Sequence, residues 1–244
     1  MTETDRAALL RVLPYARRYA RALTGSQQHG DALVAEALRG VLAATPPAGE
    51  HALRVAMYGA ISDAAPYEDA GQEMTSVQRK LLLLTALEEM PLTDAAAALR
   101  VQVDAAEHEL RVARDRLRAG AAVRVLIIED EPIIALDIQE LVERCGHSVV
   151  GIAATEQEAV EIARRDPPTL VLADINLGVG GDGATAVARI LTHISVPVIF
   201  VTAYPERLLT GDVTEPAFVI TKPFDPTTLA VATYQAVTRG LRPV

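Results

Sequence analysis

Acidic, basic and hydroxyl side chains follow several short apolar runs in the second half of this 244-residue chain. They are Glu129 and Asp130 after one run, and Asp174, Thr202 and Lys222 after three others. Crowded carboxylates are costly unless a cation neutralises them, and a set of oxygen ligands suits Mg²⁺. With the metal bound, Asp174 is a candidate nucleophile toward a phosphoryl group, because carboxylates form acyl phosphates. The Lys222 ammonium and the Thr202 hydroxyl would then stabilise the phosphoryl oxygens.

The elements that must position these residues are short runs rich in β-branched side chains, which alternate with helical patterns after Gly120. The expected strands cover 123–128, 149–153, 169–173, 197–201 and 217–221. Five repeats of a strand and a helix predict a doubly wound α/β fold with a parallel sheet and helices on both faces. Because ligands bind at the carboxyl edge of such a sheet, the five side chains are expected to converge there.

The first half of the chain has helical apolar periodicity throughout, which predicts an all-α domain. The expected helices cover about 6–23, 28–43, 50–64, 78–89, 92–99 and 103–118. A polar stretch at 66–73 divides them into two groups, 1–65 and 75–120. The last two helices have the spacing of a helix-turn-helix. However, the helix that would read DNA begins with Asp104, Glu107 and Glu109, whose carboxylates would repel phosphate.

The composition limits the classes of partner. A net charge of −9 argues against binding to nucleic acid through bulk electrostatics. Cys145 is the only cysteine, so an internal disulfide and a cysteine-based zinc site are excluded. The sequence opens on no signal-peptide pattern, and no apolar run approaches the roughly 18 residues of a membrane span. These features predict a soluble cytoplasmic protein.

Four motifs of the second half resemble those of the receiver domain of two-component response regulators. They are Ile127–Glu131, Ala173–Leu177, Val201–Ala203 and Thr221–Phe224. The resemblance implies that residues 121–244 form a receiver, and that Asp174 accepts phosphate from a histidine kinase or a phosphotransfer protein. It also implies that Asp130, Asp174 and the backbone carbonyl of Asn176 bind Mg²⁺, with Glu129 acting through water. The bond between Lys222 and Pro223 is implied to be cis, an isomer that only an X-Pro bond reaches cheaply.

The switch of this receiver-like half departs from the common pattern. Many receivers carry an aromatic residue three positions before the lysine, where this chain has Val219. Either Tyr204 takes over the gating or aromatic gating is absent. The loop 204–211 resembles that of an atypical receiver subgroup and is expected to relay the signal, because Thr202 at its root would touch the phosphoryl group.

The first half resembles an extracytoplasmic-function sigma factor. Residues 14–25 and 31–42 are similar to the opening helices of its second region, and 78–117 to its fourth region. The DNA-binding charges differ, since Arg54 is the only arginine of residues 51–69. The expected organisation is therefore a sigma-like domain at 1–120, with a region-2-like part at 1–65 and a region-4-like part at 75–120.

A sigma-like domain followed by a receiver resembles the PhyR-type regulators of the alphaproteobacterial general stress response. The resemblance implies that phosphorylation opens the protein, so that the sigma-like domain sequesters a NepR-like anti-sigma factor and frees the true sigma factor. One alternative is a DNA-binding transcription factor controlled by its receiver. The other is a magnesium-dependent phosphatase, but Asn176 stands where a second carboxylate two residues after Asp174 would act as acid and base. No enzymatic turnover is therefore expected.

Overall fold

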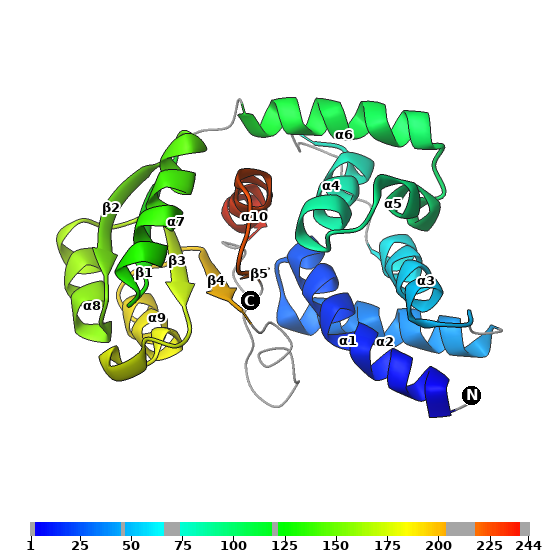
Figure 1. Cartoon of the computed structure of the whole chain (residues 1–244), viewed down its shortest axis with the longest axis horizontal. Coiled ribbons are helices and arrows are strands. Elements are labelled where there is room, and N and C mark those ends of the chain that lie inside the picture. Colours follow the sequence, from blue (N-terminus) through cyan, green and yellow to red (C-terminus); the bar gives the residue numbers. More distant parts are fainter. Residues whose placement is uncertain (1–2, 45–46, 66–73, 119–121, 204–217, 240–244) are drawn as a thin grey trace. The chain divides into compact units, whose positions relative to one another are not determined.

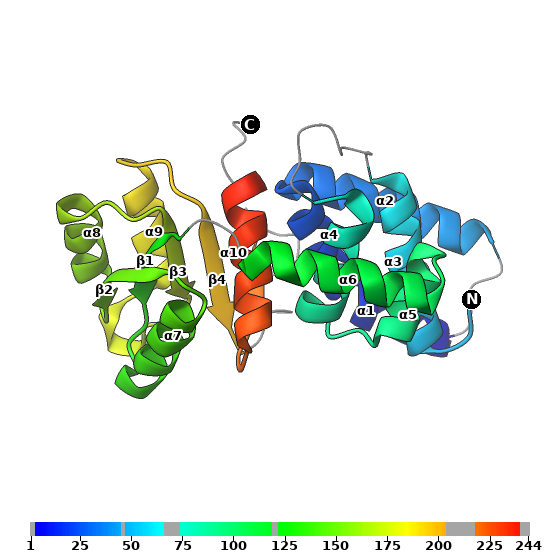
Figure 2. The same cartoon turned by 90° about the horizontal axis from the view of Figure 1, so that it is seen from above.

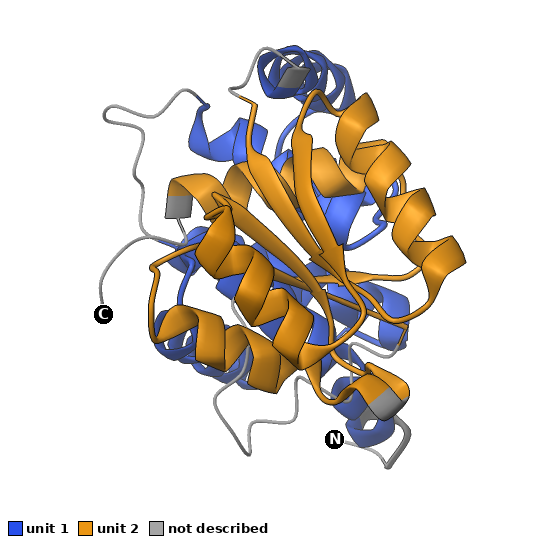
Figure 3. Cartoon of the chain, turned by 90° about the vertical axis from the view of Figure 1, so that its left-hand side faces the viewer, with its two compact units in different colours: residues 1–119, 206–217 blue, residues 120–205, 218–244 orange. Residues whose placement is uncertain are grey.

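The computed structural model describes residues 3–44, 47–65, 74–118, 122–203 and 218–239 (Figure 1). These residues form two compact units, one made of helices and one built on a sheet (Figure 3). The fold class predicted from the sequence, an all-α domain followed by a doubly wound α/β domain, is confirmed. Among the described residues, no helix has both the length and the apolar composition needed to cross a membrane.

The helical unit contains two groups of helices. The first group is α1 (Glu3–Thr24), α2 (Gln27–Ala43) and α3 (Glu50–Ala64); the second is α4 (Ser76–Leu82), the π-helical turn η1 (Leu83–Leu87), α5 (Leu92–Leu99) and α6 (Val103–Arg118). The Ser26 side chain caps α2, and Thr75 with Gln78 forms a capping box at the start of α4. The expected helix at 78–89 thus begins two residues earlier and changes to π geometry in its second half.

The two helix groups pack directly on each other. Helix α3 lies against α5, and α1 lies against η1. Gly59 permits the first of these contacts, because a Cβ at that position would lie 2.9 Å from the Ala98 carbonyl oxygen. The apolar core includes Tyr19 of α1, Met57 of α3 and Leu84 of η1, all with 0% exposure. The described helices of residues 3–118 therefore share one core.

The sheet unit has five parallel strands in the order β2-β1-β3-β4-β5. They are β1 (Arg124–Ile128), β2 (Ser148–Ala153), β3 (Leu170–Asp174), β4 (Val198–Thr202) and β5 (Val219–Thr221). The helices are α7 (Pro132–Arg144), α8 (Glu156–Arg165), α9 (Gly183–Leu191) and α10 (Pro226–Arg239), with a short 3₁₀ turn η2 (Gly178–Gly180). Helices α8 and α9 contact each other, as do α7 and α10, and the two pairs cover opposite faces (Figure 2). The strand order reverses between β1 and β3, where a ligand crevice is expected.

Two glycines of the helical unit make a matched pair for testing the α3–α5 contact. Gly59→Ala should lower the free energy of unfolding by about 1–3 kcal/mol, because its Cβ would meet backbone. Gly40→Ala, within α2, should raise it by about 0.5–1 kcal/mol, since nothing lies within 4 Å of its Cβ and alanine favours helix. Urea unfolding followed by circular dichroism measures both. Equal effects of the two substitutions would contradict the close packing at Gly59.

Candidate functional site

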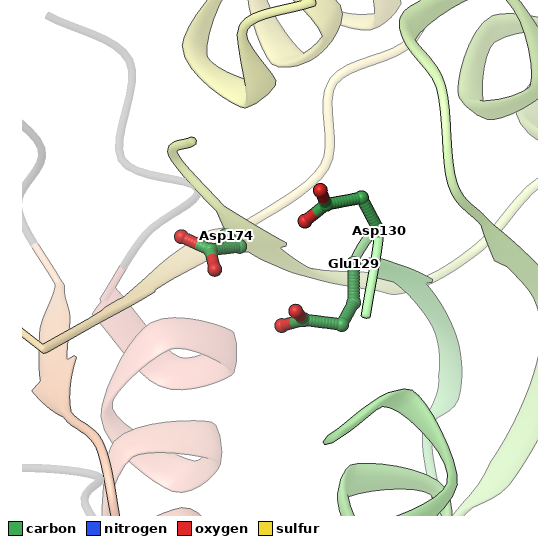
Figure 4. Close-up of side chains that lie close together, drawn as sticks. All are labelled: Glu129, Asp130 and Asp174. Atoms are coloured by element: carbon green, nitrogen blue, oxygen red, sulfur yellow. The ribbon is translucent and has the colours of Figure 1, made fainter. Parts of the chain in front are cut away.

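Three carboxylates gather at the carboxyl ends of β1 and β3. Glu129, Asp130 and Asp174 each offer an oxygen within 4.8 Å of the others, and the close-up in Figure 4 shows their side chains around one space. Parallel pairing of Ile128 with Ala173 puts the ends of the two strands side by side. Glu129 is 1% exposed, whereas Asp130 and Asp174 are half-buried. Clustered hard oxygen ligands with one exposed side are a donor set that fits Mg²⁺.

Lys222 brings a positive charge to these carboxylates. Its Nζ donates to Glu129 Oε2 at 2.5 Å and to Asp174 Oδ2 at 2.6 Å. Burial lowers the pKa of Lys222, but the hydrogen bonds to the two carboxylates outweigh it and hold this pKa above its usual value. Burial raises the pKa of Glu129 above its usual value in spite of the ammonium. The lysine therefore neutralises part of a charge that the buried site disfavours. The peptide bond between Lys222 and Pro223 is cis, the isomer that the resemblance implied.

The loop after Asp174 is held tightly against the start of α9. The Asn176 N–H donates to Asp174 Oδ1 at 3.2 Å, and the Gly183 N–H donates to the Ile175 carbonyl at 2.8 Å. A Cβ on Gly183 would lie 1.7 Å from the Asp174 carbonyl oxygen, so only glycine fits. The Asp182 side chain caps α9 by accepting from the Ala184 N–H. Sequence reasoning missed Gly183, although an aspartate and a glycine just before an apolar helix are a visible signal of such a start.

A pocket of about 710 Å³ opens beside Asp174, one of the three clustered carboxylates. Asp174, Asn176, Thr202 and Lys222 line it together with side chains of α7 and Phe224. The α7 side chains in its wall include Ile134, Ile138 and Leu141. The pocket thus places the reactive groups next to apolar side chains of α7. The sequence did not predict that α7 lines the site, because the apolar face of an amphipathic helix gives no sign of whether it packs in the core or lines a pocket.

The structure brings together all but one of the predicted site residues. Glu129, Asp130, Asp174 and Lys222 are in contact or close to it, and Thr202 and Asn176 line the same pocket. Tyr204 and the loop 204–211, predicted to act as the switch, lie outside the described residues. Val219, which stands where many receivers have an aromatic residue, is buried in β5.

Comparisons with known proteins identify both halves of the chain. The family described as the sigma2 domain of PhyR matches residues 9–62, and the family of response regulator receiver domains matches residues 125–234. The receiver match includes the polar residues that line the pocket, namely Asp174, Asn176, Thr202 and Lys222.

Relatives match over nearly the whole length. The phyllosphere-induced regulator PhyR of Methylorubrum extorquens is 42% identical over 243 residues, covering 92% of this chain and 91% of that protein. The crystal structure of the response regulator PhyR from Brucella abortus matches with a TM-score of 0.85 and 41% identity, covering 98% of this chain and 95% of that one. The structure of the anti-anti-sigma factor PhyR from Bartonella quintana matches with a TM-score of 0.84 and 39% identity, covering 93% of each chain.

Removing the Lys222 ammonium should make the stability of the fold depend more strongly on pH than it does in the wild type. In Lys222→Met the pKa of Glu129, already raised, should rise further above 4.5, its value in the unfolded chain. A group with a raised pKa stabilises the fold below the unfolded pKa, and this stabilisation is lost as the pH rises. The variant should therefore approach the wild type near pH 5 and be less stable by about 3 kcal/mol at pH 7.5.

Urea unfolding at the two pH values measures this difference. Arg144→Met is a control, because Arg144 pairs with Glu140 on the surface and should matter by less than about 1 kcal/mol. A loss in Lys222→Met that is the same at both pH values would contradict the role assigned to Glu129.

The first helix group of the helical unit and most of the sheet unit are thus each matched by a known family, and a relative aligns along both. The match to the Methylorubrum extorquens regulator, at 42% identity, covers more than nine-tenths of each chain. The chain belongs to the PhyR family of response regulators.

Proposed function

We propose that this protein is a phosphorylation-activated anti-anti-sigma factor of a general stress response. Phosphorylation of Asp174 makes the sigma-like helical unit available to a NepR-like anti-sigma factor, and the true sigma factor is released. The observation that carries the proposal is the contact of Lys222 with Asp174 and Glu129, in a chain whose residues 9–62 match the sigma2 domain of PhyR. The Bartonella quintana relative is named an anti-anti-sigma factor, which supports the same role here.

The chemistry begins with transfer of a phosphoryl group to a carboxylate oxygen of Asp174. A bond forms between that oxygen and phosphorus while the bond from phosphorus to the donor, a histidine kinase or phosphotransfer protein, breaks. Glu129, Asp130, Asp174 and the Asn176 carbonyl would hold Mg²⁺, which offsets the negative charge of the transferred group. Lys222 already lies at Asp174 and can pair with a phosphoryl oxygen. The Thr202 hydroxyl, in the same pocket, can donate to another.

Phosphorylation must then shift the equilibrium between a state in which the helical unit can bind the anti-sigma factor and a state in which it cannot. Moving an equilibrium from 1:99 to 99:1 needs about 5.5 kcal/mol of differential stabilisation. The acyl phosphate carries nearly two negative charges where the Asp174 carboxylate carried one, beside the half-buried Lys222 ammonium and two further carboxylates. We infer that Tyr204 and the loop 204–211 transmit this change of charge, since this segment begins directly after β4. A partner that controls transcription implies that the protein works in the cytoplasm.

Direct DNA binding is disfavoured by where the basic side chains point. Arg54, in the helix that carries promoter-contacting groups in sigma factors, donates to the Tyr58 hydroxyl at 3.3 Å and to the Glu88 carbonyl. Arg17 and Arg21 both bind Asp31. At the start of α6, Asp104 and Glu107 are exposed. Arginines that bind their own fold cannot neutralise phosphates at the same time, and exposed carboxylates repel them.

A phosphatase function is disfavoured by the residue two positions after Asp174. Hydrolysis by a carboxylate nucleophile needs a second group to take and give protons, and Asn176 cannot do this near neutral pH. Asn176 instead uses its backbone N–H to bind Asp174 Oδ1. We therefore expect only slow loss of the protein's own phosphate.

Capture of the anti-sigma factor should require Asp174, Mg²⁺ and a phosphoryl donor together. Isothermal titration of the full chain with a NepR-like protein should show binding at least about tenfold tighter after treatment with donor and Mg²⁺. Asp174→Ala, or removal of Mg²⁺ by EDTA before treatment, should abolish the increase. Asp166→Asn is the control, because this carboxylate pairs with Arg124 near the start of β1 and should change nothing.

The same experiment can refute the proposal. Binding whose strength is equal with and without donor, or equal in wild type and Asp174→Ala, would remove the switch. A salt-dependent shift of promoter DNA by the phosphorylated chain would favour the DNA-binding alternative instead.

A further inference from the structure

The carboxylate of Glu88 is completely buried where the two helix groups of the sigma-like unit meet. Glu88 directly follows the π-helical turn η1 of the second group and has 0% exposure. A carboxylate without solvent is costly unless it is paired and hydrogen-bonded. Its hydrogen-bond partners come from two helices of the first group, α1 and α3.

Helix α1 supplies the charge that pairs with Glu88. Arg18 Nε donates to Glu88 Oε1 at 2.9 Å, and Arg18 Nη2 donates to Oε2 at 3.0 Å and to the Leu87 carbonyl at 2.7 Å. The Arg18 side chain is 4% exposed. Burial lowers the pKa of Arg18, but the Glu88 charge outweighs it, so the guanidinium stays protonated. This fork-shaped pair fixes both the distance and the angle between α1 and η1.

Helix α3 supplies two further contacts. The Tyr58 hydroxyl donates to Glu88 Oε2 at 2.6 Å, and Arg54 donates to the Glu88 backbone carbonyl. Burial, and next the Glu88 charge, raise the pKa of Tyr58 well above its usual value, which keeps the hydroxyl a donor. One residue of the second group is therefore held by α1 and α3 at once.

The backbone around Glu88 departs from ordinary helix geometry. The Glu88 N–H donates to the Leu83 carbonyl, one residue further back than in an α-helix, and Glu89 has a φ of 52°. Non-glycine residues with a positive φ are uncommon, because their Cβ crowds the backbone in this region. The chain accepts this geometry at the point that carries the Glu88 side chain to Arg18 and Tyr58.

We propose that Glu88, together with Arg18, is a positioning residue that fixes the two helix groups in the one arrangement that the anti-sigma partner recognises. A buried ion pair adds little net stability compared with apolar residues of similar size, but its geometry is specific. The pair joins residues 70 positions apart, across the break between the groups. This inference rests on the proposed function for the identity of the partner, but not for the arrangement itself.

Distance measurements between spin labels test the arrangement. The labels would sit on exposed positions of the two groups, Ala35→Cys in α2 and Glu107→Cys in α6, in a Cys145→Ser background. The full chain should show one narrow distance distribution. Glu88→Gln leaves Arg18 buried without its carboxylate, and Arg18→Met with Glu88→Met removes both charges while keeping the volume. Both should broaden the distribution, and the double variant should keep a wild-type thermal midpoint within a few degrees.

A matched control separates positioning from stability. Asp31→Asn takes the carboxylate from Arg21, which is also 0% exposed, but this pair lies wholly within the first group. It should destabilise the chain and leave the distance distribution narrow. A narrow, wild-type distribution in the Arg18 and Glu88 double variant would overturn the positioning role.

Titration of the phosphorylated chain with a NepR-like protein tests recognition. The double variant should bind at least tenfold more weakly, whereas Asp31→Asn should bind as the wild type does once folded. Broadened distances with unchanged affinity would overturn the inference that the arrangement is what the partner recognises. If the phosphorylated wild type does not bind the NepR-like protein, the proposed function is refuted. If the distance distribution of the double variant is still broadened in that case, the role of Glu88 in the arrangement is confirmed.

Discussion

Three carboxylates held together at one edge of a sheet are the constraint around which the sheet unit is built. Like charges this close repel, and Glu129 is out of reach of solvent. Lys222 offsets the repulsion because it follows β5 at the same edge of the sheet, where its ammonium binds Glu129 and Asp174. The arrangement depends on charge balance, so adding a phosphoryl group to Asp174 cannot leave its neighbours unaffected. The charges of the site balance one another before any reaction, so a change of charge on Asp174 alters the interactions of its neighbours.

The helical unit uses charge in the opposite way. Several of its arginines are turned inward, where Arg18 binds Glu88 and Arg21 binds Asp31. A sigma factor would present basic side chains to DNA, but here several of them stabilise the protein's own fold. What remains on the outside includes the acidic start of α6. A surface that keeps the shape of a sigma factor without its positive charge is suited to a protein partner of that factor.

Patterns that are local in sequence predicted most of the fold and the reactive end of the site. The five strands were visible as apolar runs, and parallel topology then placed Asp174 beside Glu129 and Lys222. The network around Glu88 could not be predicted, because nothing in a helical pattern indicates that Arg18 reaches a residue 70 positions away. The π-helical turn was missed for a related reason, since its geometry depends on tertiary contacts and not on helix propensity. The fit of glycine against a backbone carbonyl is likewise invisible without coordinates.

The central claim is that a phosphorylated carboxylate in one unit controls mimicry of a sigma factor by the other. The most direct measurement starts from a preformed complex of an anti-sigma factor with its fluorescently labelled sigma factor, and follows release of the label. The phosphorylated chain should release the sigma factor in proportion to its concentration, and the unphosphorylated chain should release little. Release that does not depend on phosphorylation, or anti-sigma binding that leaves the sigma factor in place, would contradict the claim.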